Sequence, residues 1–108
     1  MILVFKHILP SKFIGVAIYP FIFIKDKSFK TDLQLINHEK IHLKQQLELL
    51  LLPFFIWYAI EFLFRYIQFK NAQIAYKNIS FEKEAYINES NLNYLNDRKL
   101  FSFLKYLK

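Results

Sequence analysis

The stretch Asn37-His38-Glu39-Lys40-Ile41-His42 contains two histidines four residues apart, with a glutamate directly after the first. On a helix, residues four apart lie one above the other on the same face, so His38 and His42 can present both imidazoles to one metal ion. Glu39 lies about 100° further around the helix and can reach over an open coordination position of that metal. Two imidazoles beside a carboxylate suit zinc.

The motif lies in the middle of a predicted helix over residues 31–52. Thr31 and Gln34 have the spacing of a capping box, and Pro53 ends or kinks the helix. Apart from the metal face, the surface of this helix is apolar except for one narrow polar stripe, which predicts a helix buried on nearly all sides. The stripe consists of Asn37, Lys40, Lys44 and Glu48.

Residues 1–27 predict short strands. Residues 13–24 are twelve apolar or aromatic residues, too few for a membrane span and suited to one long or two short strands. Proline cannot donate to the ladder of a central strand, so Pro20 places the strand over residues 20–25 at an edge of the sheet.

The second half of the chain predicts further helices. An apolar helix is expected over residues 54–68, a glutamate-bearing helix over residues 81–96 and an amphipathic tail over residues 97–108. We therefore expect a single α+β domain, mostly helical, with a small N-terminal β-sheet or hairpin and the histidine-bearing helix at its centre. A chain of 108 residues suits one domain with one core.

Residues 49–60 are twelve consecutive uncharged residues, fewer than the roughly 18 expected of a membrane span. Two interpretations stay open: a helix buried in the core, or a helix at a membrane surface with contact through residues 49–67. The N-terminus does not have the pattern of a signal peptide, so we expect a cytoplasmic protein or one peripheral at the inner face of the membrane.

Composition restricts the chemistry. The chain has no cysteine, so a metal site must use histidine and carboxylate. The net charge is +6, but 13 of the 15 basic residues are scattered lysines, and none of the usual recognition motifs is present. We therefore do not expect nucleic-acid binding.

A catalytic zinc needs a third protein ligand, and the motif has no His-x-x-Gly-x-x-His continuation. The carboxylates further along are Glu82, Glu84 and Glu89. On a helix, Glu84 falls in the apolar, inward stripe, whereas the other two fall on the polar side. An inward carboxylate is costly unless it is paired or bound to metal, which favours Glu84 as the ligand. The alternative is an ion pair between Glu84 and a lysine.

The pattern His38-Glu39-x-x-His42, followed 42 residues later by Glu84-Ala85, resembles the gluzincin zinc metallopeptidases, and the short length is similar to minigluzincins. The resemblance implies a zincin-like minimal domain with His38, His42 and Glu84 as zinc ligands and Glu39 as general base. It also implies that an edge strand, here residues 20–25, pairs with an extended peptide substrate.

The sequence therefore predicts a zinc-dependent metallopeptidase. The alternative is a catalytically weak or inactive zinc-binding, membrane-associated interaction protein, because 108 residues leave little room for substrate subsites. Tyr76 or Tyr86 is expected to stabilise the oxyanion, and His7 is expected to be structural. Residues expected to line the cleft or support the ligands are Gln45, Gln46, Tyr86 and Asn88.

Overall fold

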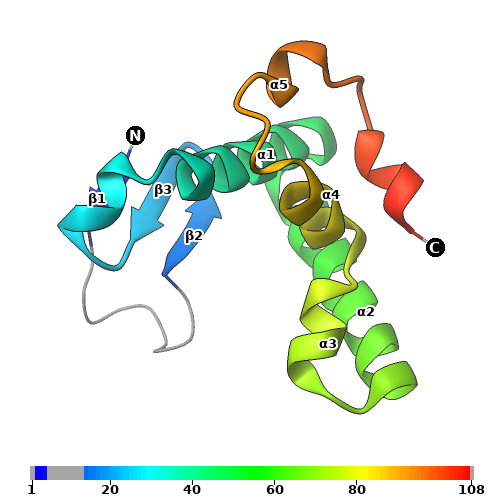
Figure 1. The fold of residues 1–108 in the computed structure, drawn as a ribbon. Coiled ribbons are helices and arrows are strands. Elements are labelled where there is room, and N and C mark those ends of the chain that lie inside the picture. Colours follow the sequence, from blue (N-terminus) through cyan, green and yellow to red (C-terminus); the bar gives the residue numbers. More distant parts are fainter. Residues whose placement is uncertain (1, 5–13, 108) are drawn as a thin grey trace.

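The computed structural model describes residues 2–4 and 14–107. They form a small three-stranded sheet followed by helices, which confirms the predicted α+β, mostly helical fold (Figure 1). His7 lies outside the described residues. The strands are β1 (Ile2–Val4), β2 (Gly15–Ile18) and β3 (Phe21–Ile24); the helices are α1 (Leu33–Leu49), α2 (Leu51–Phe69), α3 (Ala72–Lys77), α4 (Ser80–Asn88) and α5 (Tyr94–Asp97), with short 3-10 helices η1 (Lys27–Thr31) and η2 (Ser102–Tyr106).

The sheet has the strand order β1-β3-β2, with β1 parallel and β2 antiparallel to β3. The prediction of an edge strand over residues 20–25 is therefore wrong, since β3 is the central strand. Pro20 lies in the turn between β2 and β3, where its missing N–H does not interrupt the ladder. The edge strand that packs beside α1 is β2.

The boundaries of α1 differ from the predicted capping box. Asp32, not Thr31, caps the helix, because its carboxylate accepts a hydrogen bond from Leu35 N–H at 3.1 Å. The helix ends at Leu49, and its cap Leu50 has a φ of 67°, whereas the prediction ended it at residue 52, before Pro53. Pro53 lies in the first turn of α2, where no N–H donor is needed and where its ring would clash with a continuing helix.

The predicted helix over residues 81–96 is shorter in the structure, because α4 ends at Asn88. The buried amide of Asn37 donates to the carbonyls of Asn88, Glu89 and Asn91, which fixes α1 against this helix end. The chain then turns through α5 and returns in η2. The tail therefore packs on α4, with Phe103 buried against Phe81.

Two apolar clusters hold α1 in the middle of the molecule. One lies between the sheet and α1 and contains Ile22, Ile24 and Ile36. The other joins α2, α4 and η2. Because the sheet packs on one side of α1 and α4 on another, the polar residues in the middle of α1 are enclosed (Figure 1). The second cluster contains Phe54, Ile79, Phe81 and Phe103.

Across residues 2–4 and 14–107, no single helix has the length and apolar composition needed to cross a bilayer. The pair α1 and α2 meets that criterion together, but the two helices are bent by 111° at their junction.

Candidate metal centre

The two histidines of α1 meet one carboxylate of α4 in the interior. His38 Nε2 and His42 Nε2 lie 3.2 Å apart, and Glu82 Oε1 lies 3.2 Å from the first and 3.0 Å from the second. All three residues are buried. The helical spacing brings the two imidazoles together, and the packing of α4 on α1 supplies the carboxylate.

These separations fit a zinc ion. In a tetrahedral site with metal–ligand bonds of about 2.0–2.1 Å, neighbouring ligand atoms lie roughly 3.3 Å apart. The three distances between the ligand atoms of His38, His42 and Glu82 are within a few tenths of an ångström of that value. Two nitrogens and one oxygen form a typical set of three protein ligands for a catalytic zinc, which leaves a fourth position open.

The hydrogen-bond donors indicate why a cation belongs at this point. Gln45 directs its amide nitrogen to Phe81 O and Glu84 Oε1, so its oxygen must accept from His42 Nδ1–H at 2.8 Å. His38 Nδ1 likewise faces the carboxylate of Glu89 at 2.9 Å. In a metal-bound form with each proton on Nδ1, both Nε2 atoms would present lone pairs toward the side on which the Glu82 oxygen lies. Three acceptors that converge in the interior require a proton or a metal ion between them.

Each of the three ligands also has an outer partner. Glu89 holds His38, Gln45 holds His42, and Tyr58 donates its hydroxyl to Glu82 Oε2 at 2.7 Å. Partners of this kind fix the imidazole tautomer and ring orientation at metal sites.

His42 and Glu82 shift each other's pKa strongly, even without a metal ion. Burial by itself lowers the pKa of the His42 imidazole, but the Glu82 carboxylate, with Glu39 and Gln45, outweighs it and raises that pKa to about 9. Burial raises the pKa of Glu82, yet the two adjacent imidazoles hold it well below its ordinary value. Without a metal, the cluster therefore holds a proton on His42 near neutral pH, and a metal ion that binds there must displace that proton.

Glu39 lies at the mouth of the cluster. Its carboxylate is buried, and burial is the main reason that its pKa is raised, although the neighbouring histidines oppose that rise. A Cβ atom placed on Gly15 would be 3.3 Å from Glu39 Oε2, so the edge strand passes directly beside this carboxylate. A carboxyl group with a raised pKa is suited to hold a proton near neutral pH.

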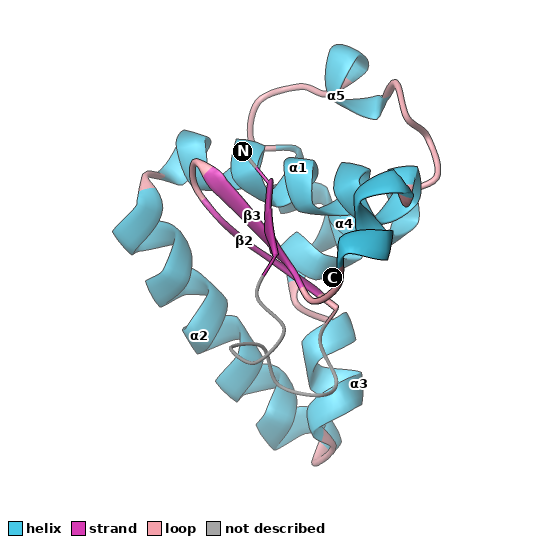
Figure 2. Ribbon diagram, turned by 90° about the vertical axis from the view of Figure 1, so that its left-hand side faces the viewer, coloured by secondary structure: helices cyan, strands magenta, loops and turns pink. Residues whose placement is uncertain are grey.

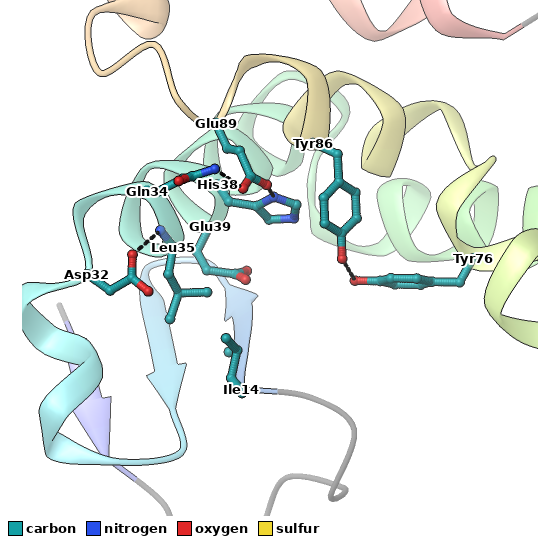
Figure 3. Close-up of a pocket in the computed structure, with 10 residues that line it drawn as sticks. Ile14, Asp32, Gln34, Leu35, His38, Glu39, Tyr76, Tyr86 and Glu89 are labelled. Atoms are coloured by element: carbon teal, nitrogen blue, oxygen red, sulfur yellow. Dashed lines mark hydrogen bonds and ion pairs between the residues drawn. The ribbon is translucent and has the colours of Figure 1, made fainter.

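Two cavities adjoin at Glu39. The first, of about 290 Å³, lies between the start of α1, Ile14 and the tyrosines Tyr76 and Tyr86 (Figure 3). The second, of about 210 Å³, lies between β2 and the first turns of α2, and His42 and Glu82 line it. The candidate ligands His38, His42 and Glu82 thus line cavities that adjoin β2.

Glu84, the ligand predicted from the sequence, needs correction. Its carboxylate is fully buried, as predicted, but it binds the guanidinium of Arg98, accepts from Tyr94 OH at 2.6 Å and accepts from Gln45 Nε2 at 2.9 Å. Arg98 also pairs with Glu48 at 2.6 Å. The inward position of Glu84 reflects an ion pair with an arginine, and Glu82 is the carboxylate beside the histidines.

The other predicted residues are distributed around this centre. Gln45 is the partner of His42, Gln46 lines the second cavity and links α1 to β2, and Tyr86 places its ring edge-on to His38 with centroids 4.5 Å apart. The side-chain amide of Asn88 donates to Glu84 O and to Tyr106 OH, so this residue supports the end of α4 rather than the candidate ligands.

The sequence reasoning missed the roles of Glu82, Glu89, Tyr58 and Arg98. It assigned Glu82 and Glu89 to a polar, outward face of α4. Their spacing of seven residues puts them two turns apart on one side of that stretch, and both contact His38. That spacing was the available signal, because two carboxylates on one side of a stretch can face a histidine as well as water.

Comparison with protein-family models, with curated proteins and with solved structures finds no match to this chain.

Proposed function

We propose that this protein is a zinc-dependent metallopeptidase of the gluzincin type, with His38, His42 and Glu82 as zinc ligands and Glu39 as general base. The observation that carries the proposal is the convergence of two imidazole nitrogens and one carboxylate oxygen, at tetrahedral spacing, in the interior of the protein. The resemblance to gluzincins then rests on the His-Glu-x-x-His motif and on a glutamate from a separate helix, since Glu84-Ala85 no longer supplies the ligand.

A bound zinc ion supplies Lewis acidity, which activates water near neutral pH and polarises the scissile carbonyl. The Glu39 carboxylate accepts the proton of the attacking water and returns it to the leaving amine. Its raised pKa favours the first half of that transfer, in which the carboxylate would accept the proton. Tyr76 and Tyr86 line the same cavity, and burial raises the pKa of both phenols, so they remain protonated and can donate to the developing oxyanion.

The outer edge of β2 at Gly15 supports an extended peptide as the substrate, whereas further along that edge Gln46 bonds both Ala17 O and Tyr19 N–H. Lys25 N–H donates to Ile14 O, and hydrogen-bonded pairs alternate along an antiparallel ladder. The backbone groups of Gly15 and Ala17 therefore point away from β3. The carbonyl of Ala17 accepts from Gln46 Nε2 at 2.8 Å, whereas Gly15 lies beside Glu39 and both cavities. A peptide that pairs with Gly15 would pass next to the general base.

Metal content and cleavage, measured together, test this proposal. We expect about one zinc per chain in the wild type, strong loss of zinc in His42→Ala, and retention of zinc in Glu39→Gln. Cleavage of a denatured protein should fall roughly 10²–10⁴-fold in Glu39→Gln, because the positioned proton acceptor is lost while the metal stays. Cleavage that does not depend on Glu39 would contradict the peptidase assignment.

One observation favours a second candidate, a zinc-binding interaction protein with little or no proteolysis. The two cavities are at or below the lower end of the roughly 300–1,000 Å³ range of ligand pockets, which leaves little space for side-chain subsites. This candidate predicts the same zinc content and the same loss in His42→Ala, but no cleavage by the wild type of any peptide library.

A further inference from the structure

The helix α2 has its polar and apolar sides reversed relative to a surface helix of a water-soluble domain. Six large apolar side chains along it are each more than half exposed, and Leu50 at its start is also exposed. Figure 2 shows α2 along one side of the molecule, with the sheet, α1, α3 and α4 on its inner side. The six residues are Leu52, Ile56, Ile60, Leu63, Phe64 and Ile67.

The only charged residues of α2 are turned toward the protein. Glu61 accepts from Trp57 Nε1 and from the backbone N–H of Ser80. Arg65 donates to Gln68 and to the carbonyl of Leu107. A surface helix in water usually places its charges outward and its apolar stripe inward. Every residue of α2 is described, and no charged side chain lies on its outer side.

We propose that α2 docks this protein on a lipid bilayer that contains anionic lipids, with the helix lying in the interfacial plane. At 100° per residue, the exposed apolar residues from Leu51 to Phe64 cover an arc of roughly 220°. A single partner helix covers a stripe of about 100°, as in ordinary helix packing. A lipid phase can cover the wider arc because it is apolar from every direction. An interfacial helix usually has an apolar face toward the lipid and a polar face toward water. In this protein, the rest of the domain covers the side of α2 that faces away from the lipid.

Charge and composition agree with this occupant. The net charge is +6, and Lys70 and Lys77 are exposed at the end of α2 and the end of α3. Cations beside an apolar face attract anionic headgroups. The joined α1 and α2 also meet the length and composition criterion for a bent segment.

This docking places the metal centre near the bilayer surface. The inner side of α2 carries Tyr58, which donates to the ligand Glu82 at 2.7 Å, while its outer side is the lipid-facing arc. Bilayer contact does not depend on zinc or on cleavage. A test can therefore refute bilayer contact while the proposed peptidase function holds, or refute the peptidase function while bilayer contact holds.

The test uses two substitutions at equally exposed isoleucines. Ile60 on α2 and Ile87 on α4 are both 63% exposed, so Ile60→Glu and Ile87→Glu add the same charge with the same small effect on folding. The full chain is mixed with vesicles of equimolar phosphatidylcholine and phosphatidylglycerol, and the bound fraction is measured by flotation. Far-ultraviolet circular dichroism and zinc content check that each variant is folded.

We expect the wild type and Ile87→Glu to float with the vesicles, and Ile60→Glu to lose roughly tenfold or more in partition, since one isoleucine no longer enters the apolar phase. Weaker binding to pure phosphatidylcholine vesicles supports the anionic preference. Equal partition of both variants overturns the role of α2. A wild type that stays off the vesicles but forms a dimer that Ile60→Glu dissociates overturns the proposal in favour of a second copy.

Discussion

Glu82 and Glu84 lie two residues apart on α4, and both are buried, yet they belong to different kinds of polar cluster. Glu84 is matched by a cation from the chain, since Arg98 binds it together with Glu48, and Tyr94 and Gln45 donate to its remaining positions. Glu82 receives one phenolic donor and otherwise faces two imidazole nitrogens. A buried carboxylate with its own arginine is structural, whereas one without a cation of its own is a candidate ligand.

The two clusters are also connected. Gln45 accepts from His42 on the ligand side and donates to Glu84 on the arginine side. One amide therefore sets the orientation of a ligand from a network that the C-terminal segment completes through Arg98. The stability of that segment and the geometry of the metal centre are therefore expected to be coupled through Gln45, and the coupling is reciprocal.

The largest expected effect comes from Arg98→Met. Removing the guanidinium leaves the buried carboxylates of Glu48 and Glu84 without their cation, so the free energy of unfolding should fall by about 3–5 kcal/mol. Urea denaturation measures this. The control is Arg65→Met, which removes hydrogen bonds to Gln68 and to a carbonyl and should cost roughly 1 kcal/mol. Equal costs for the two arginines would remove the distinction between the clusters.

The next largest effect is a difference between Glu82 and Glu84 in how much zinc stabilises their glutamine variants. At a free zinc concentration about 100 times Kd, binding should stabilise the wild type by roughly 2.7 kcal/mol. Glu82→Gln should lose most of that increment because it removes a ligand charge, while Glu84→Gln should keep the increment even though its starting stability is lower. Denaturation with zinc and with a chelator gives both numbers. An increment that survives in Glu82→Gln and disappears in Glu84→Gln would restore the assignment made from the sequence.

The parts of the fold set by local patterns were predicted well, and those set by distant partners were not. The apolar run over residues 54–68 and the burial of the histidine-bearing helix follow from spacing along one segment, and the structure has both. The end of α1 at Leu49 is an exception, because the ring of Pro53 clashes with the carbonyl four residues before it, and this local effect was placed three residues late, at residue 52.

The carboxylates show the same limit more sharply. Helical periodicity correctly placed Glu84 inside, but periodicity cannot say which cation meets it. Arg98 follows the end of α4 and a turn through α5, and its approach to Glu84 and Glu48 depends on where α4 stops. Glu82 was assigned to solvent because its position on the predicted helix falls among polar residues, and periodicity along α4 cannot show that α1 covers that side.

A smaller effect is expected at Glu89, which holds His38 Nδ1 at 2.9 Å. Glu89→Gln keeps an acceptor oxygen but loses the charge that makes the imidazole a stronger ligand, so zinc affinity should fall about tenfold, at the lower end of such effects. Competition with a chromogenic chelator measures the affinity. Asp97→Asn on α5, an exposed acidic residue, is the control for net charge. Equal losses in the two variants would mean that only overall charge matters.

The smallest effect is expected at Gly15, on the edge strand beside the general base. A Cβ there would lie 3.3 Å from Glu39 Oε2 and 3.3 Å from Leu35 Cδ1, so Gly15→Ala must displace the carboxylate by a few tenths of an ångström. Zinc content should not change, since the ligands are untouched, while the cleavage rate should fall several-fold, less than the roughly 10² that a full ångström of misplacement costs. Ile18→Ala, on the opposite face of β2, should leave both unchanged. Loss of zinc in Gly15→Ala would show that β2 supports the zinc ligands rather than Glu39. Gly15 would then belong with the residues that position Glu82 and the two histidines.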